Sequence, residues 1–215
     1  MNRSVREVLL FHGGFGLLAA AVVAATPAAQ FGRWVLVLAI AYNLLLPLYA
    51  VFRGEPGWID RWLFMLGVSA LQVLPDWVLV SVTQTLHFHD HGIYRIGDAV
   101  PVYFMGLWVM VLFPVTLIAD HSRSARYLAA ALLGGLAFTA AEWLAVPLQL
   151  WSPRNVDTFA GFALYPIPAE MALCVAALWL YRKTAHDGLL ERIWAVGLAP
   201  VCYTGALMLS LLYFS

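Results

Sequence analysis

The sequence predicts an all-α integral membrane protein, a polytopic bundle of seven transmembrane helices, from three observations. Of its 215 residues, 63% are hydrophobic and 11% are charged, whereas soluble domains are about 45–50% apolar and about 25% charged. Apolar runs long enough to cross a hydrocarbon core, about 17–25 residues, occur seven times in succession. The breaks between these runs are short and rich in proline, glycine and charged residues, as loops are.

The seven spans leave no connection long enough for a separate domain, so residues 1–215 are predicted to form a single seven-helix transmembrane domain. A signal peptide is the alternative for the first span, because Arg3 and Arg6 precede its apolar stretch. That stretch is long for a signal peptide, and Thr26-Pro27-Ala28 is a poor cleavage site, so a helix is favoured. The predicted spans are 6–27, 33–52, 62–83, 100–119, 126–147, 161–182 and 190–213.

The basic residues are distributed unevenly between the two predicted sides of the membrane. Cytoplasmic loops carry an excess of Lys and Arg, and nine of the twelve basic residues lie in the N-terminal segment or near the second, fourth and sixth connections. The N-terminus is therefore expected in the cytoplasm and the C-terminus outside, in a cell inner membrane. The nine residues are Arg3, Arg6, Arg53, Arg61, Arg123, Arg126, Arg182, Lys183 and Arg192.

Three carboxylates, Asp76, Glu142 and Glu170, lie inside the third, fifth and sixth spans. Charges there are costly and usually face a bundle interior or a cavity. At a rise of 1.5 Å per residue, each acid lies roughly 20–24 Å from the basic residue that marks the cytoplasmic end of its span. In a core about 30 Å thick, all three then share one depth in the outer half. We expect them to meet around a common polar chamber. The basic reference residues are Arg61, Arg126 and Lys183.

Polar and aromatic residues near these acids are predicted to contact a substrate. Gln72 lies one turn before Asp76 on the same helix face, and tryptophan faces beside the acids favour cations. Pro166 and Pro168 remove helix hydrogen-bond donors, so the sixth span is expected to be loosened before Glu170. Structural roles are the alternative, because polar groups also join helices and aromatic residues form interfacial belts. The predicted substrate-binding residues are Gln72, Trp77, Asp98, Tyr103, Trp108, Thr139, Trp143 and Tyr165.

The connection after the third span contains three alternating histidines, His87, His89 and His91. An extended segment would turn their imidazoles to one side. With Asp90 and Asp98 nearby, such a group suits zinc or a similar ion. The spacing does not supply a complete ligand set, so a polar lid over the chamber is the favoured interpretation and a divalent metal is the alternative. No cofactor is predicted.

The segment Tyr165-Pro-Ile-Pro-Ala-Glu170 resembles the Pro-x-Glu-Glu segments of membrane-bound lycopene cyclases. The chain is also similar in size to the small seven-helix meroterpenoid cyclases. Glu170 matches the first acid of the family pair, while Met171 stands at the second position and departs from the pattern. The resemblance covers one helix and the general architecture. It implies an acid that protonates an alkene or epoxide of an isoprenoid, with aromatic rings stabilising the cation.

These observations favour an intramembrane enzyme that acts on a lipophilic, isoprenoid or terpenoid substrate by non-redox acid–base chemistry, as a cyclase or isomerase does. Asp76, Glu142 and Glu170 would supply the acid, the base and an orienting group, in an order that the sequence leaves open. The alternatives are a small-molecule or lipid transporter with proton-coupled acids, and a metal-dependent hydrolase that uses the histidine loop. A lipophilic substrate and membrane lipids are the expected partners. Zero net charge argues against a nucleic acid, and the only lysine, Lys183, ends an apolar run, which excludes a retinal Schiff base.

Overall fold

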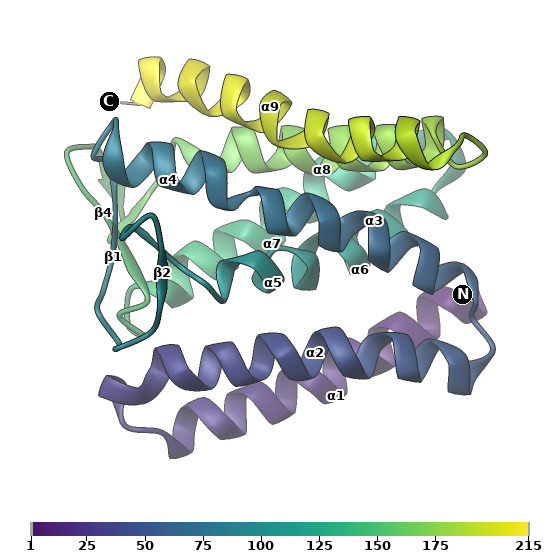
Figure 1. The fold of residues 1–215 in the computed structure, drawn as a ribbon, viewed down its shortest axis with the longest axis horizontal. Helices are drawn as coiled ribbons and strands as arrows, with labels where there is room; N and C mark the ends of the chain where they lie inside the picture. Colours follow the sequence, from purple (N-terminus) through teal and green to yellow (C-terminus); the bar gives the residue numbers. More distant parts are fainter. Residues whose placement is uncertain (1, 215) are drawn as a thin grey trace.

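Helices that lie side by side along one axis account for most of residues 2–214, the part of the chain that the computed structural model describes (Figure 1). The chain passes along this axis seven times, and the two ends of the chain lie at opposite ends of the bundle (Figure 1). The predicted helical bundle is thereby confirmed. The helices are α1 Arg3–Ala25, α2 Phe31–Arg53, α3 Gly57–Leu71, α4 Val73–Ser81, α5 Phe104–Leu107, α6 Val109–Asp120, α7 Arg126–Ala145, α8 Pro166–Lys183 and α9 Leu189–Phe214, with the 3-10 turns η1 Ala28–Gln30 and η2 Arg123–Ala125.

Two of the seven passes consist of two consecutive helices. Helices α3 and α4 meet at Gln72, and α5 and α6 meet at Trp108, and both junction residues keep helical backbone angles. Pro75 explains the first junction, because it has no N–H to donate to the carbonyl of Leu71. Each pair therefore continues in one direction without a turn (Figure 1).

Five helical segments among the described residues are long and apolar enough to cross a membrane. They are Arg3–Ala25, Ala28–Arg53, Gly57–Ser81, Arg123–Ala145 and Leu189–Phe214. The segment Phe104–Asp120 is apolar but shorter, and α8 has 18 residues that include Glu170, Arg182 and Lys183. Large apolar side chains remain exposed on the outer helices, among them Leu17 at 75% and Leu212 at 78%. Such a surface is stable in contact with lipid rather than water.

Six short strands at one end of the bundle modify the all-α prediction. They form three antiparallel pairs, and the pair β1–β4 joins the two long connections, with His87 opposite Ser152. Figure 1 shows β1, β2 and β4 beside the end of α4. Pairing satisfies backbone groups that a coil over this end of the bundle would leave unbonded. The strands are β1 Leu86–Phe88, β2 Arg95–Ile96, β3 Val100–Pro101, β4 Trp151–Pro153, β5 Thr158–Phe159 and β6 Phe162–Ala163.

The strands also correct the predicted starts of the fourth and sixth spans. The fourth pass becomes helical at Phe104, because residues 100–101 pair with β2, and the sixth becomes helical at Pro166, because residues 162–163 pair with β5. Pro166 therefore lies in the first turn of α8. A proline there removes no helix hydrogen bond, because the first N–H groups of a helix have no intrahelical partner. The expected loosening before Glu170 does not occur.

Helix α8 lies inside the bundle and contacts α3, α6, α7 and α9. Its side chains Leu173, Cys174 and Leu178 are completely buried. The close contact with α7 depends on Gly134, since a Cβ atom at that position would lie 2.5 Å from the sulfur of Cys174. Small residues that allow helices to approach closely are common at membrane helix interfaces. This close packing fixes the position of α8, and therefore of Glu170, relative to the neighbouring helices.

Candidate functional site

A cavity beneath the strands is lined by all three acids that were predicted from the sequence to share a chamber. Asp76 comes from α4, Glu142 from α7 and Glu170 from α8. Leu86 and Phe88 of β1 line the same space, with Trp151 and Pro153 of β4, so the paired connections cover the cavity. The helix rise per residue predicted that the three acids lie at one level. The structure adds that α4, α7 and α8 pack so that all three side chains line the same cavity.

The cavity has a volume of about 80 Å³, and a water molecule needs about 10–15 Å³ on this measure. It therefore has room for several waters or for part of an apolar molecule. The empty space between the lining side chains, including the part that opens outward, is about 690 Å³. The enclosed volume is smaller than the volume of about 300–1,000 Å³ that is typical of ligand pockets, but the lining resembles theirs because it is mostly apolar with a few polar groups. Its aliphatic lining includes Leu79, Leu86, Leu107, Val111, Ala141 and Ala163.

Two of the acids accept hydrogen bonds from indole groups. The Nε1–H of Trp108 donates to Oδ2 of Asp76 at 3.2 Å. The Nε1–H of Trp151 donates to Oε2 of Glu142 at 3.1 Å. An indole has one donor and no acceptor, so each tryptophan fixes its carboxylate in orientation and satisfies one of its oxygens.

Glu170 differs from the other two acids because no hydrogen bond to its side chain occurs among the described residues. The residue is 2% exposed, and its Oε2 is buried without a hydrogen-bond partner. Buried polar atoms in proteins nearly always have a partner, and leaving one unpaired costs free energy. Its neighbours in α8, Leu173 and Cys174, are apolar and offer no compensation. The unpaired carboxyl group therefore needs a functional explanation or a partner from outside the chain.

Seven aromatic side chains surround the acids, and they are themselves packed in fixed positions. The hydroxyl groups of Tyr165 and Thr85 lie 3.0 Å apart, within hydrogen-bond distance. Trp108 packs against Phe138, with ring centroids 5.1 Å apart, and against Tyr203 at 5.5 Å. Aromatic faces attract cations, so the lining can stabilise a positive charge on a bound hydrocarbon. The seven residues are Phe88, Phe104, Trp108, Phe138, Trp151, Tyr165 and Tyr203.

Of the eight predicted substrate-binding residues, Trp108 and Tyr165 line the cavity. Gln72 and Tyr103 are buried but lie outside the lining, and neither the Gln72 amide nor the Tyr103 hydroxyl has a hydrogen-bond partner among the described residues. Asp98 lies in an exposed turn with a φ of 58°. None of these three contributes to the cavity wall.

Three further predicted residues, Trp77, Thr139 and Trp143, lie away from the cavity. Trp77 is 40% exposed and Trp143 is 57% exposed. Each tryptophan follows an acid directly in the sequence, and one residue along a helix is a rotation of about 100°. Thr139 and Trp143 share an outer face of α7, where they line a shallow groove together.

The histidine loop forms part of the lid, with its imidazoles turned away from the cavity. Phe88 is 1% exposed and lines the cavity, while His87 and His89 project from the other face of the strand, with ring centroids 5.2 Å apart. The His91 ring does not stack with this pair. Its Nε2 instead lies within hydrogen-bond distance, 2.8 Å, of the carbonyl oxygen of Gln149. Within residues 2–214, no three His, Cys, Asp or Glu side chains are grouped as metal ligands.

The electrostatic environment of the lid keeps two of its histidines neutral. Burial lowers the pKa of both His87 and His89, and the positive charges of Arg154 and Arg95 lower these pKa values further. Arg95 is held in place by its hydrogen bonds to the carbonyl oxygens of Phe88 and His89, at 3.0 and 2.9 Å. The lowered pKa values favour the uncharged form of both imidazoles in the folded lid.

Three cavity residues that the sequence did not predict, Thr85, Trp151 and Tyr203, come from the connections between helices and from the last helix. Trp151 lies in β4 and reaches Glu142, Thr85 lies before β1 and bonds Tyr165, and Tyr203 lies in α9. The apolar character of Tyr203's neighbours gives no sign of a site. Only the pairing of β1 with β4 indicates that Thr85 and Trp151 belong to one wall.

A family model described as a domain of unknown function (DUF6989) matches residues 73–214. The matched segment runs from α4 to α9 and contains all three cavity acids, while α1, α2 and α3 lie outside it. No curated protein and no solved structure matches the chain.

Proposed function

We propose that this chain, which belongs to the DUF6989 family, is an intramembrane enzyme that rearranges an apolar, isoprenoid-type substrate by acid–base chemistry. The observation that carries the proposal is the meeting of three carboxyl groups at one aromatic-lined cavity, one of them without a partner. In this proposal all seven helical passes cross a cell inner membrane, with the N-terminus in the cytoplasm. The cavity then lies in the outer half of the bilayer, where an apolar substrate can enter from lipid.

Glu170 is the proton donor in this proposal. Its carboxyl group faces the cavity and has no hydrogen-bond partner among residues 2–214. A protonated carboxyl carries one O–H donor, and no neighbouring acceptor competes with the substrate for it. A general acid must reach the atom that it protonates, and a position on the cavity wall meets that requirement.

Asp76 and Glu142 act as the base and the orienting group. Each is held by an indole N–H, which favours a carboxylate that accepts a proton without changing position. Preorganised groups of this kind lower the cost of reorganisation during a reaction. The two acids lie on different helices, so they flank the cavity from two sides.

The proposed reaction is balanced without an oxidant or a reductant. The π electrons of a substrate double bond take the proton of Glu170 to form a new C–H bond, which leaves a carbocation on the neighbouring carbon and a carboxylate on Glu170. Trp108, Tyr165 and the other ring faces stabilise the cation, and the apolar walls exclude water that would capture it. Asp76 or Glu142 then removes a proton next to the final cation, which restores a double bond. Transfer of that proton back to Glu170 completes the cycle.

The test is product formation by the purified full-length protein with a panel of polyprenyl compounds, chosen after native mass spectrometry of co-purified lipids. The reaction is run in D₂O, because a proton delivered by an exchangeable carboxyl group introduces deuterium on carbon. We expect labelled product from the unmodified protein. Glu170→Gln should lower turnover by about 10²–10⁴-fold, the usual contribution of a general acid, and Asp76→Asn and Glu142→Gln should also lower it.

Asp98→Asn is the matched control, because it removes a carboxylate at the same end of the bundle but outside the cavity. Its left-handed backbone angle is one that asparagine tolerates, and we expect normal turnover. Equal turnover in all of the cavity variants and the control would refute the proposal. Proton-coupled flux of the compounds in liposomes without any product would instead indicate a transporter.

A further inference from the structure

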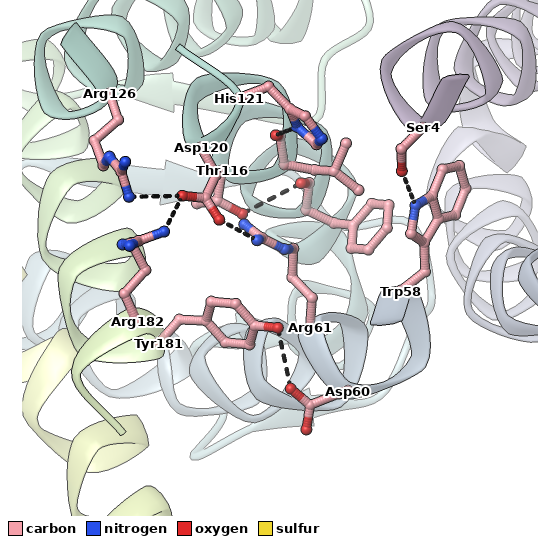
Figure 2. Close-up of polar contacts among 12 residues, drawn as sticks. Ser4, Trp58, Asp60, Arg61, Thr116, Asp120, His121, Arg126, Tyr181 and Arg182 are labelled. Carbon is pink, nitrogen blue, oxygen red and sulfur yellow. Dashed lines mark hydrogen bonds and ion pairs between the residues drawn. The ribbon is translucent and has the colours of Figure 1, made fainter. Parts of the chain in front are cut away.

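Four charged side chains from four helices meet at the end of the bundle opposite to the strands. Figure 2 shows Asp120 of α6 in contact with Arg61 of α3, Arg126 of α7 and Arg182 of α8. Arg61 contacts Oδ2 of Asp120 at 2.6 Å, while Arg126 and Arg182 contact Oδ1 at 3.3 and 2.5 Å. We call this group the arginine cluster. It lies outside the cavity, and none of its four residues lines the cavity wall.

The arginine cluster holds more positive than negative charge. Three guanidinium groups share one carboxylate, and among residues 2–214 Asp120 is the only acid that forms ion pairs with them. The neighbouring acid Asp60 already accepts from Arg192 at 2.6 Å and from Tyr181 at 3.0 Å. Two positive charges therefore remain uncompensated, and like charges this close to one another repel. A bound anion would remove this repulsion.

Arg61 provides a second, independent observation. Its side chain is 10% exposed, and its Nη1 is buried with no hydrogen-bond partner. The guanidinium group lies over the ring of Tyr181, 4.4 Å from the centroid, which holds it in place. A buried charged donor without an acceptor is costly. Residues 2–214 supply no acceptor for this donor, and a bound ligand would supply one.

We propose that the arginine cluster binds a phosphate group. Guanidinium groups present paired N–H donors that match the oxygens of phosphate, and Arg126 and Arg182 are 20% and 41% exposed, so a ligand can reach them. The phosphate can belong to an anionic lipid headgroup or to a soluble phosphate. Basic pockets between membrane helices bind lipid headgroups of this type. This inference is independent of the proposed enzyme activity.

The experiment measures the thermal stability of the full-length protein with each source of phosphate. One arm titrates inorganic phosphate in neutral detergent micelles, at an ionic strength held constant with chloride. The other arm compares nanodiscs of phosphatidylcholine with nanodiscs that also contain phosphatidylglycerol. A ligand that binds only the folded state raises the unfolding temperature. We expect a rise in at least one arm, and the arm that responds identifies the source.

Arg182→Gln should weaken the binding by about tenfold or more, which corresponds to the loss of one charge-assisted contact. Lys183→Gln is the matched control, because it removes one positive charge from the next residue, which forms no ion pair within the described chain. Arg126→Gln is the second variant if Arg182→Gln does not fold, and it should weaken binding similarly. No stabilisation in either arm, or equal stabilisation of the Arg and Lys variants, would overturn the proposal.

Discussion

Three carboxyl groups of similar chemistry line the cavity, but the residues around them give them different properties. Trp108 and Trp151 each donate an N–H to one acid, while the Glu170 side chain has no hydrogen-bond partner in the described part of the chain. A carboxylate that accepts a hydrogen bond is held in one orientation, whereas an unpaired carboxyl group is free to interact with a ligand. At the scale of single residues, the indole donors therefore distinguish the three acids, and this difference is the basis for the proposed roles.

The two neutral histidines of the lid predict a pH dependence of stability. His87 and His89 have lowered pKa values because of burial and nearby arginines, so the folded state binds fewer protons than the unfolded chain below about pH 6.5. Their contribution to stability is complete above that pH and is lost as the pH falls through the lowered pKa values. We expect the unfolding temperature to fall as the pH is lowered below about 6.5.

The measurement is the unfolding temperature as a function of pH for the unmodified protein and for the double variant His87→Gln, His89→Gln. The variant should lose less stability on acidification, because glutamine does not titrate in this range. His186→Gln is the control, since His186 is exposed in the connection before α9. Parallel pH profiles for the unmodified protein and the double variant would contradict this prediction.

At the scale of helices, three passes each carry a cavity acid near one end and an arginine of the cluster near the other. In the α3–α4 pass these residues are Asp76 and Arg61. Helices α7 and α8 each carry one such acid and one such arginine as well. Asp120 of α6 joins all three arginines (Figure 2). A shift of one helix along its axis would separate its arginine from Asp120. We therefore expect the cluster to help keep the three acids at one level. The residues of the other two passes are Arg126 and Glu142 in α7, and Arg182 and Glu170 in α8.

Removal of the shared carboxylate should affect both ends of these helices. Asp120→Asn leaves three guanidinium groups together without their anion, and we expect a loss of about 3 kcal/mol, the lower end for a broken buried ion pair. Turnover should also fall, because the acids lose their alignment. Thermal unfolding in detergent and the product assay measure the two effects.

Asp60→Asn is the comparison for this variant. Asp60 lies at the same end of the bundle, but its side chain is 47% exposed, and within residues 2–214 its only ion pair is with Arg192. Exposed ion pairs contribute about 0–1 kcal/mol, so its loss should be small. Equal destabilisation by the two variants would show that the arginine cluster does not align the helices.

At the scale of the whole molecule, the two ends of the bundle differ in structure and in charge. Paired strands and an enclosed cavity occupy one end, and the arginine cluster with the ion pair Asp60–Arg192 occupies the other. Glu7 also forms ion pairs with Arg6 and Arg53, near the end of α2 and the start of α1. Basic residues favour the cytoplasmic side of a membrane. We therefore expect the strand end to face outward.

Fusion reporters test this orientation together with the number of crossings. We expect a fluorescent protein at the N-terminus to fold in the cytoplasm, and alkaline phosphatase at the C-terminus to be active outside, because an odd number of crossings separates the two ends. Phosphatase fused after residue 120 should be inactive, and phosphatase fused after residue 154 should be active. An inactive C-terminal fusion with an active fusion after residue 120 would reverse the orientation.

Much of the fold is determined by local properties of the sequence. Long apolar runs, of which Gly57–Ser81 is one, must become helices if lipid surrounds them, because lipid supplies no hydrogen bonds to the backbone. The level of Asp76 along its helix also follows from the sequence, since the rise per residue is constant. The boundaries at Phe104 and Pro166 do not follow, because strand pairing with distant residues sets them.

The tertiary structure decided which neighbours the acids have. Trp77 and Trp143 adjoin acids in the sequence but point elsewhere, while Trp151, nine residues from Glu142, contacts it. The rotation of each helix about its axis and the pairing of β1 with β4 depend on packing between distant segments, and no local pattern encodes either one. The sequence by itself determined a membrane bundle with three acids at one level. Packing alone decided that Glu170 would be the acid without a partner, because a hydrogen bond between side chains exists only when two separate helices or strands bring them together.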